Sequence, residues 1–108
     1  MASKQEQKVI AAALAGGDGA HIARLAESYY YGRGRDKNLK TALQLWERAA
    51  ELGNAEALYY CGVCRYYGDG VSRDKDMAFA FWEQAAQLGH AGAQMSLDTL
   101  RPAQEQET

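Results

Sequence analysis

The sequence predicts an all-α fold, an array of antiparallel helix pairs built from one repeated unit. Its clearest sign is self-similarity at a spacing of 36 residues: YYGRG at 30–34 returns as YYGDG at 66–70, and WERAAELGNAEA at 46–57 returns as WEQAAQLGHAGA at 82–93. Such a period indicates one supersecondary unit stacked on itself. Apolar residues follow helical spacing, and the single proline, Pro102, lies where this periodicity stops. We expect about six helices.

The N-terminus can be interpreted in two ways. Basic residues precede a short apolar run at 9–15, and Ala13-Leu14-Ala15 resembles a signal-peptidase site. The run is short and rich in alanine, and Ile10 lies 36 residues before Trp46, in phase with the repeat. We therefore expect a partial leading repeat helix near residues 5–15, within a cap at 1–19, in preference to a signal peptide.

The remaining elements follow from helix start and stop signals. In the second unit we expect helix A over 55–67 after Asn54 and helix B over 75–88 after Asp74, because both side chains are good N-caps. Glycines favour the left-handed C-cap conformation, and we expect them to end the A helices at positions 32 and 68 and the B helices at positions 53 and 89. The predicted order is repeat 1 at 20–53, repeat 2 at 54–89, a closing A helix within 90–101 and a flexible polar tail at 102–108.

The packing pattern is also visible in the sequence. Gly62 interrupts helix A, where glycine costs about 1 kcal/mol relative to alanine, so we expect a close helix–helix approach there. Each B helix combines one large residue, Trp46 or Trp82, with several alanines, which lets successive helices interlock. The third copy carries Asp98 at the position of Gly62. A carboxylate is costly in a tight apolar contact, so we expect the array to end there.

One constellation of residues resembles a known family. The pattern of Gly68-Asp69-Gly70-Val71, Asp74, Ala78, Trp82, Ala85, Ala86, Gly89, Ala91 and Ala93 resembles Sel1-like repeats, relatives of tetratricopeptide repeats, over roughly residues 8–100. The resemblance implies a right-handed α/α solenoid that serves as an adaptor or assembly scaffold, without naming a partner. The sequence departs from the pattern at Arg35, at Arg65, and at the pair Cys61 and Cys64, where apolar or tyrosine residues are usual.

The tyrosines suggest where a partner would bind. If the A helices line the concave side, equivalent positions stack in three rows, which are Arg24, Tyr60 and Ser96; Glu27, Val63 and Thr99; Tyr31 and Tyr67. Tyrosine gives a large contact area at low entropic cost and recurs in binding hot spots. The partner-binding candidates are Arg24, Glu27, Tyr31, Tyr60, Val63 and Tyr67. Alternatively, rings pack between repeats, and we expect roughly half to be structural, Tyr29 first.

Catalytic and metal chemistry find little support in the sequence. Cys61-Gly62-Val63-Cys64 has the redox C-x-x-C spacing, but both thiols fall in mid-helix, where no helix N-terminus lowers their pKa. We expect Cys61 and Cys64 to serve as small buried hydrophobic residues. A thiol redox protein that acts through this pair is the alternative. The two histidines, His21 and His90, lie in different units and are expected at the surface or in caps. No catalytic residue, metal ligand or cofactor is predicted.

The function predicted from the sequence is a non-enzymatic, bacterial and cytoplasmic adaptor that binds a protein or peptide. A dedicated single-partner chaperone or a toxin-neutralising immunity protein is the alternative within binding functions. Net charge is −2 with no basic stripe, which argues against nucleic acid and a helical-repeat RNA binder. No apolar run is long enough to cross a membrane. The expected state is a monomer or a weak end-to-end homodimer.

Overall fold

The computed structural model describes residues 3–102, and this part of the chain folds into six α-helices without a strand. The helices are α1 (Lys4–Ala15), α2 (Gly19–Tyr31), α3 (Leu39–Glu51), α4 (Ala55–Tyr67), α5 (Lys75–Gln87) and α6 (Ala91–Leu100). The all-α prediction is confirmed, and α4 has the predicted bounds. Apart from Pro102, the tail predicted for 102–108 lies outside the described residues.

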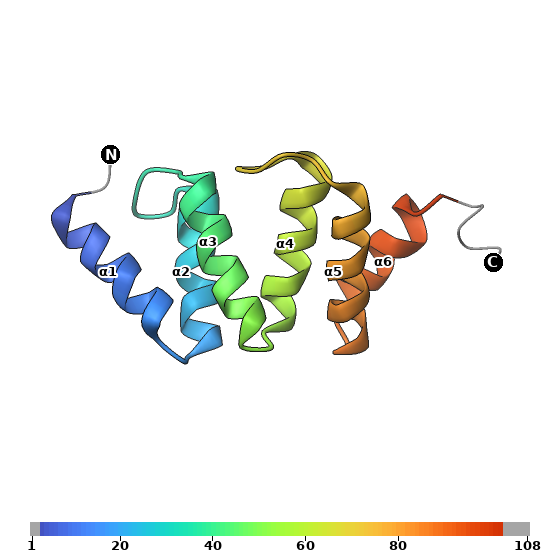
Figure 1. Ribbon diagram of the computed structural model, residues 1–108, viewed down its shortest axis with the longest axis horizontal. Helices are drawn as coiled ribbons and strands as arrows, with labels where there is room; N and C mark the ends of the chain where they lie inside the picture. Colours follow the sequence, from blue (N-terminus) through green and yellow to red (C-terminus); the bar gives the residue numbers. More distant parts are fainter. Residues whose placement is uncertain (1–2, 103–108) are drawn as a thin grey trace.

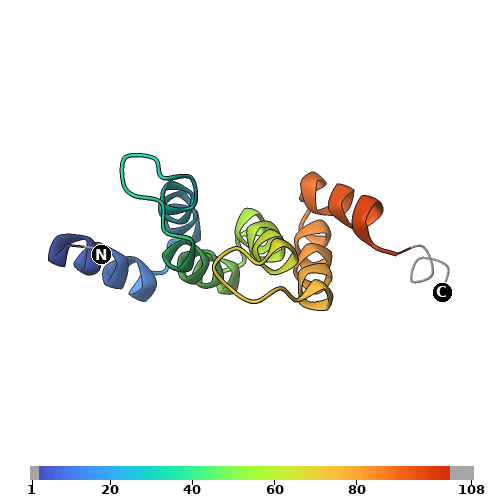
Figure 2. The ribbon, with the colours of Figure 1, turned by 90° about the horizontal axis from the view of Figure 1, so that it is seen from above.

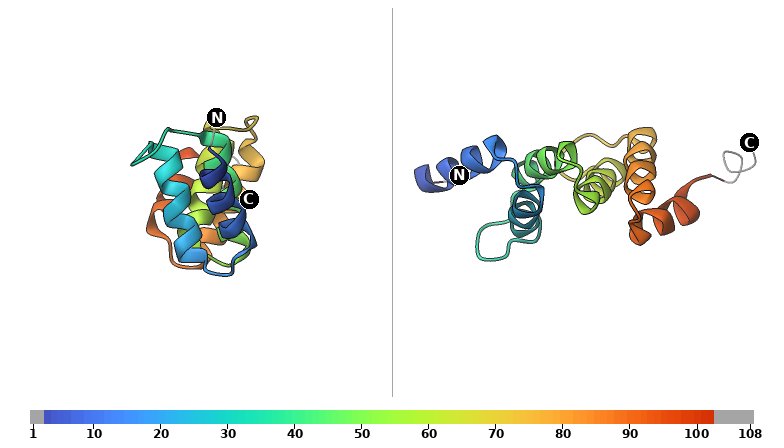
Figure 3. Two further views of the ribbon diagram at one scale, coloured as in Figure 1. Left: turned by 90° about the vertical axis from the view of Figure 1, so that its left-hand side faces the viewer. Right: turned by 90° about the horizontal axis from the view of Figure 1, so that it is seen from below.

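The helices form an elongated two-layer array with extents of 51 × 24 × 19 Å. In Figure 1 the chain rises through the rear helices α2 and α4 and descends through the front helices α3 and α5, while it advances along the long axis. Figure 2, from above, shows the two layers, and the end view in Figure 3 shows helices of successive units lying one behind another. This path is a right-handed α/α solenoid, with α2·α3 and α4·α5 as antiparallel pairs.

The predicted caps account for the helix bounds. The side chains of Asn54 and Asp74 each accept a hydrogen bond from the backbone N–H three residues later in the chain, at 2.8 and 3.0 Å. Each bond satisfies one orphan N–H of the helix. Gly68 ends α4 in the left-handed region at φ 78°, which costs a glycine little. His90 caps α6 through Nδ1, which accepts from the Ala93 N–H at 3.1 Å. The expectation of a capping histidine is confirmed at His90.

The hydrophobic core consists of two clusters, each arranged around one tryptophan. Trp46 is fully buried in the first cluster and Trp82 in the second. A Cβ added to Gly62 would meet the Trp82 indole, 2.5 Å from Cδ1. The close approach predicted at this mid-helix glycine is therefore confirmed, and Asp98, its counterpart in α6, is exposed.

The two units differ in how the tryptophan is held. Trp82 Nε1 donates to the Tyr59 carbonyl at 3.0 Å, above the space left by Gly62. In the first unit Ala26 occupies the position of Gly62, and the buried Nε1 of Trp46 has no hydrogen-bond partner. The two indoles therefore differ in their hydrogen bonding, and glycine stands beside the one that is satisfied.

Candidate functional site

The tyrosines at the end of α2 and along α4 form one connected aromatic cluster. Tyr60 lies at its centre, and its half-buried ring stacks on Trp46 with centroids 4.5 Å apart and planes 8° apart. Tyr59, Tyr30 and Tyr31 approach Tyr60 edge-on, with centroid distances of 5.3, 5.6 and 6.4 Å. Offset and edge-to-face contacts of this kind add to the stabilisation from buried area. Tyr60 therefore supports the fold as well as the surface.

Hydrogen bonds tie this cluster across the two repeats. The Tyr31 and Tyr60 hydroxyls lie 2.9 Å apart, and the Tyr30 hydroxyl donates to Asp69 Oδ2 at 2.8 Å. Burial raises the pKa of Tyr30 above its ordinary value, and the nearby Asp69 carboxylate raises it further. Burial and the Tyr31 hydroxyl likewise raise the pKa of Tyr60. Both hydroxyls therefore stay protonated at neutral pH, and that of Tyr30 donates to Asp69.

The exposed part of the candidate surface consists mainly of two tyrosines at equivalent positions. Tyr31 is 46% exposed and Tyr67 is 56% exposed. The Arg33 guanidinium lies 4.7 Å from the Tyr31 ring centroid and forms an ion pair with Glu27 at 2.6 Å. These contacts hold Tyr31 in place while one side of its ring stays open.

The structure brings some of the predicted candidates together and separates others. Glu27, Tyr31 and Tyr60 lie in one neighbourhood. The Tyr31 hydroxyl bonds to Tyr60, which lies two helical turns before Tyr67, the residue predicted to share a row with Tyr31. Tyr67 instead meets the edge of Tyr66 at 4.9 Å. Val63 is half-buried against the second core cluster, and Arg24 is exposed.

Several tyrosines are clearly structural. Tyr29 is 2% exposed, which confirms it as a core residue. Tyr59 stacks on His90 at 4.7 Å, and Tyr66 packs 5.5 Å from Trp82. The expected division between structural and exposed rings is therefore present.

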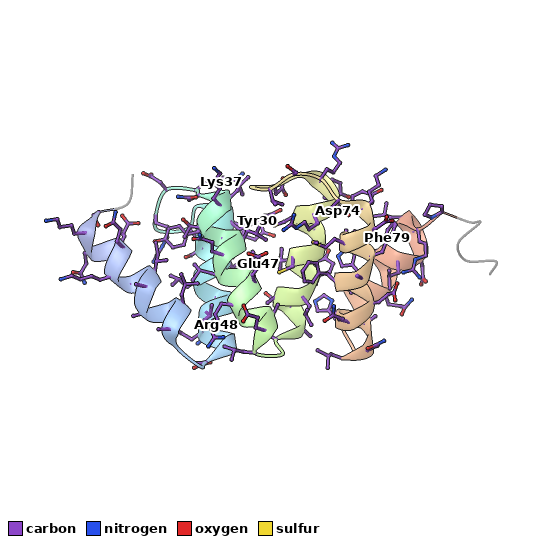
Figure 4. All side chains as sticks on the ribbon, in the orientation of Figure 1. Tyr30, Lys37, Glu47, Arg48, Asp74 and Phe79 are labelled. Carbon is purple, nitrogen blue, oxygen red and sulfur yellow. The ribbon has the colours of Figure 1, made fainter. Side chains whose placement is uncertain are left out.

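Two features of this cluster were not predicted from the sequence: the hydrogen bond from Tyr30 to Asp69 and the contact of Arg33 with the Tyr31 ring. Tyr30 and Asp69 are 39 positions apart, and no sequence signal links them. Arg33 could have been noticed as the cation that directly follows the tyrosine-glycine end of α2. Figure 4 shows the labelled Tyr30 side chain between α3 and α4, close to the top of the array.

The two cysteines are buried and free, as predicted. Burial raises the pKa of the Cys64 thiol to about 12 and that of Cys61 further, so the nucleophilic thiolate is strongly disfavoured. This environment is typical of structural thiols and opposes the redox alternative.

The part of the chain that the structure describes contains neither a cluster of metal ligands nor a helix that could span a membrane. Among residues 3–102, no three His, Cys, Asp or Glu side chains gather closely enough to hold a metal ion. Within the same residues, no helix has both the length and the apolar character needed to cross a bilayer.

Comparison with known proteins identifies the repeats. The Sel1 repeat profile matches residues 22–54 and 55–90, two consecutive units. The chain belongs to the Sel1 repeat family. The fold of this family is commonly a protein–protein interaction module. The comparison with curated proteins gives no significant match.

Solved structures show the same architecture. A Sel1 repeat protein from Oxalobacter formigenes is 33% identical, with a TM-score of 0.75 over 79% of this chain and 64% of its own. Cysteine-rich protein B of Helicobacter pylori is 28% identical, with a TM-score of 0.66 over 69% of this chain and 56% of its own.

A third structure is c5321, a protective antigen of uropathogenic Escherichia coli with an SLR fold. It is 29% identical, with a TM-score of 0.73 over 90% of this chain and 20% of its own. The chain thus spans less than two thirds of each of these three proteins.

Proposed function

We propose that this protein is a non-enzymatic interaction module that holds a protein or peptide partner on the face of its A helices. The observation that carries the proposal is the pair Tyr31 and Tyr67, 46% and 56% exposed at equivalent positions of α2 and α4. Large aromatic side chains left open on one face of a repeat array are typical of binding hot spots.

The local contacts support binding at low entropic cost. The Tyr31 ring is restrained by the edge of Tyr30 at 4.9 Å, by the Tyr60 hydroxyl and by the guanidinium of Arg33. A side chain already held in one conformation loses little freedom when a partner covers it.

The six candidate residues divide into two roles. Tyr31, Tyr67, Arg24 and Glu27 would touch the partner, because their side chains are exposed or half-exposed. Tyr60 and Val63 would position this surface, because Tyr60 stacks on Trp46 and Val63 packs against the core. The proposed location is the cytoplasm, where thiols such as those of Cys61 and Cys64 stay reduced.

The test begins with affinity purification and mass spectrometry to find the partner. The double variant Tyr31→Ala with Tyr67→Ala should then weaken binding by at least about tenfold, which is about 1.4 kcal/mol, with little change in melting temperature. Gln44→Ala, an exposed substitution on α3, is the matched control and should leave affinity unchanged. Undiminished binding by the tyrosine variant would refute the proposed face.

A further inference from the structure

A groove lies on the side of α4 that is opposite to the tyrosine surface, and residues of α3, α4 and α5 line it. It has a volume of about 450 Å³ and is lined by Glu47, Ala50, Glu51, Leu58, Phe81 and Gln84. Volumes of this size are typical of ligand pockets in proteins. Leu58 and Tyr67 are nine residues apart on α4, so at about 100° per residue they point to opposite sides of the helix. The groove therefore shares no residue with the tyrosine surface.

The floor of the groove lies where the two repeats meet. Ala50 and Phe81 are half-buried and each packs against both core clusters. Leu58 is 5% exposed and belongs to the second cluster. A partner side chain that entered here would therefore bury apolar area on a floor that the fold already keeps rigid.

An equivalent groove of about 420 Å³ occurs one unit later, with Glu83, Gln87 and Gln94 at the positions of Glu47, Glu51 and Leu58. The junction one unit earlier is different. One unit earlier, the wall positions of Glu47 and Glu51 are occupied by Ala11 and Ala15. The counterpart of Gln84 is Arg48, whose guanidinium spans that junction and donates to the Gly16 carbonyl at 3.2 Å. Gln84, in contrast, is exposed. The junction between α3 and α5 is therefore open where the preceding junction is bridged.

The wall of the groove is acidic and incompletely neutralised. Glu47 and Glu51 lie one helical turn apart on α3, with side chains 43% and 68% exposed. Their nearest cations are Arg65 at 3.9 Å and Arg48 at 3.6 Å. Charge-assisted hydrogen bonds are about 2.7–2.9 Å long, so these pairs leave acceptor capacity on both carboxylates. Figure 4 shows the labelled Glu47 on the side of α3 that faces α4.

We propose that this groove is a second docking site, which takes an apolar side chain of a partner protein together with an adjacent lysine or arginine. The apolar side chain lies on Ala50, Leu58 and Phe81, and the cation pairs with the two carboxylates. Two carboxylates at this spacing suit the planar, two-sided donor geometry of a guanidinium. Because the groove and the tyrosine surface lie on opposite sides of α4, the module can hold two partners at once.

The experiment uses three synthetic helical peptides as probes against the full chain, followed by NMR. The first peptide carries leucines flanked by arginines, the second replaces the arginines with glutamates, and the third replaces the leucines with alanines. Only the first should shift the Gln84 side-chain amide and the Phe81 ring signals. Its affinity should fall at least about tenfold when the salt concentration is raised to about 0.5 M.

Two variants test the groove. Glu47→Gln with Glu51→Gln removes the acidic wall, and Gln84→Arg copies the residue that bridges the preceding junction. Each should lower the affinity for the arginine peptide by at least about tenfold. The control Gln44→Arg adds the same charge elsewhere on α3 and should leave this affinity unchanged.

Three outcomes would overturn the proposal. They are equal binding of the glutamate peptide, shifts confined to Tyr31 and Tyr67, or full affinity in the Gln84→Arg variant. A loss of binding here leaves the tyrosine surface untouched, so failure of this site is distinguishable from failure of the proposed function.

Discussion

Gly62→Ala is the most informative single substitution in this molecule, because one methyl group decides how a buried tryptophan is held. The new Cβ would lie 2.5 Å from Trp82 Cδ1 and 2.9 Å from Cε2, and closest to Nε1. Real Cβ contacts are longer, so the indole must shift. That shift breaks the bond from Trp82 Nε1 to the Tyr59 carbonyl, now 3.0 Å long. In the first repeat, where Ala26 stands at the position of Gly62, Trp46 Nε1 is buried without a partner.

The magnitude follows from three terms. A buried donor left unsatisfied costs about 1–3 kcal/mol, and repacking an overfilled site costs a further 1–3 kcal/mol or so. Alanine returns about 1 kcal/mol of helix propensity at Gly62. The sum is a loss of about 1–5 kcal/mol. Because Trp46 tolerates Ala26 in the first repeat, we expect the lower half, about 1–3 kcal/mol, which is a drop of at least about 4 °C in melting temperature.

Two measurements check this reasoning. Urea denaturation followed by circular dichroism gives the change in unfolding free energy. The Trp82 indole N–H signal in NMR should move and exchange faster with solvent, while the Trp46 indole signal serves as the internal control. An unchanged or higher stability, with the Trp82 signal in place, would refute the close contact and the register that produces it.

Three further predictions follow from burial. Trp82→Ala should cost about 3–5 kcal/mol and leave much of the chain unfolded by circular dichroism; near-native melting would contradict the repeat register. Replacing Cys61 and Cys64 with alanine should lower stability but spare partner binding, and the native thiols should react slowly with Ellman's reagent. Since burial raises both thiol pKa values, stability should decline as pH rises above about 8.5, and the double variant should lack this step in alkaline urea titrations. Tyr30→Phe should lose about 0.5–1.5 kcal/mol with its bond to Asp69, and equal stability in urea would show that this tie contributes nothing.

Helix positions could be predicted because their signals are local. The spacing of 36 residues carries each cap and each tryptophan from one unit to the next, and the predicted A helix at 55–67 has the observed bounds. The close contact at Gly62 was also predictable, since a glycine in mid-helix needs a packing reason.

The division of the tyrosines was not predictable, because it depends on how consecutive helices tilt against one another. Tyr60 has Arg24 as its counterpart in the first unit, which suggested a surface position. Its stacking partner is Trp46, a residue of the preceding repeat. Tyr31 reaches Tyr60 instead of lying in a row with Tyr67, and a repeat period alone does not encode this offset.

Several differences between the two copies fall at the surfaces that we propose as docking sites. The tryptophans, which both units keep, are buried and maintain the solenoid. Some differences between the units fall in the core, as at Ala26 and Gly62. Others fall at the two proposed docking surfaces: Arg24 becomes Tyr60 beside the tyrosine face, and Arg48 becomes Gln84 at the groove. A repeat protein can alter such positions without loss of stability, because each unit depends on its neighbours only through the shared core. The residues of the two proposed surfaces come equally from repeat 1 and repeat 2, so a partner on either surface would recognise the pair of units and not one unit alone.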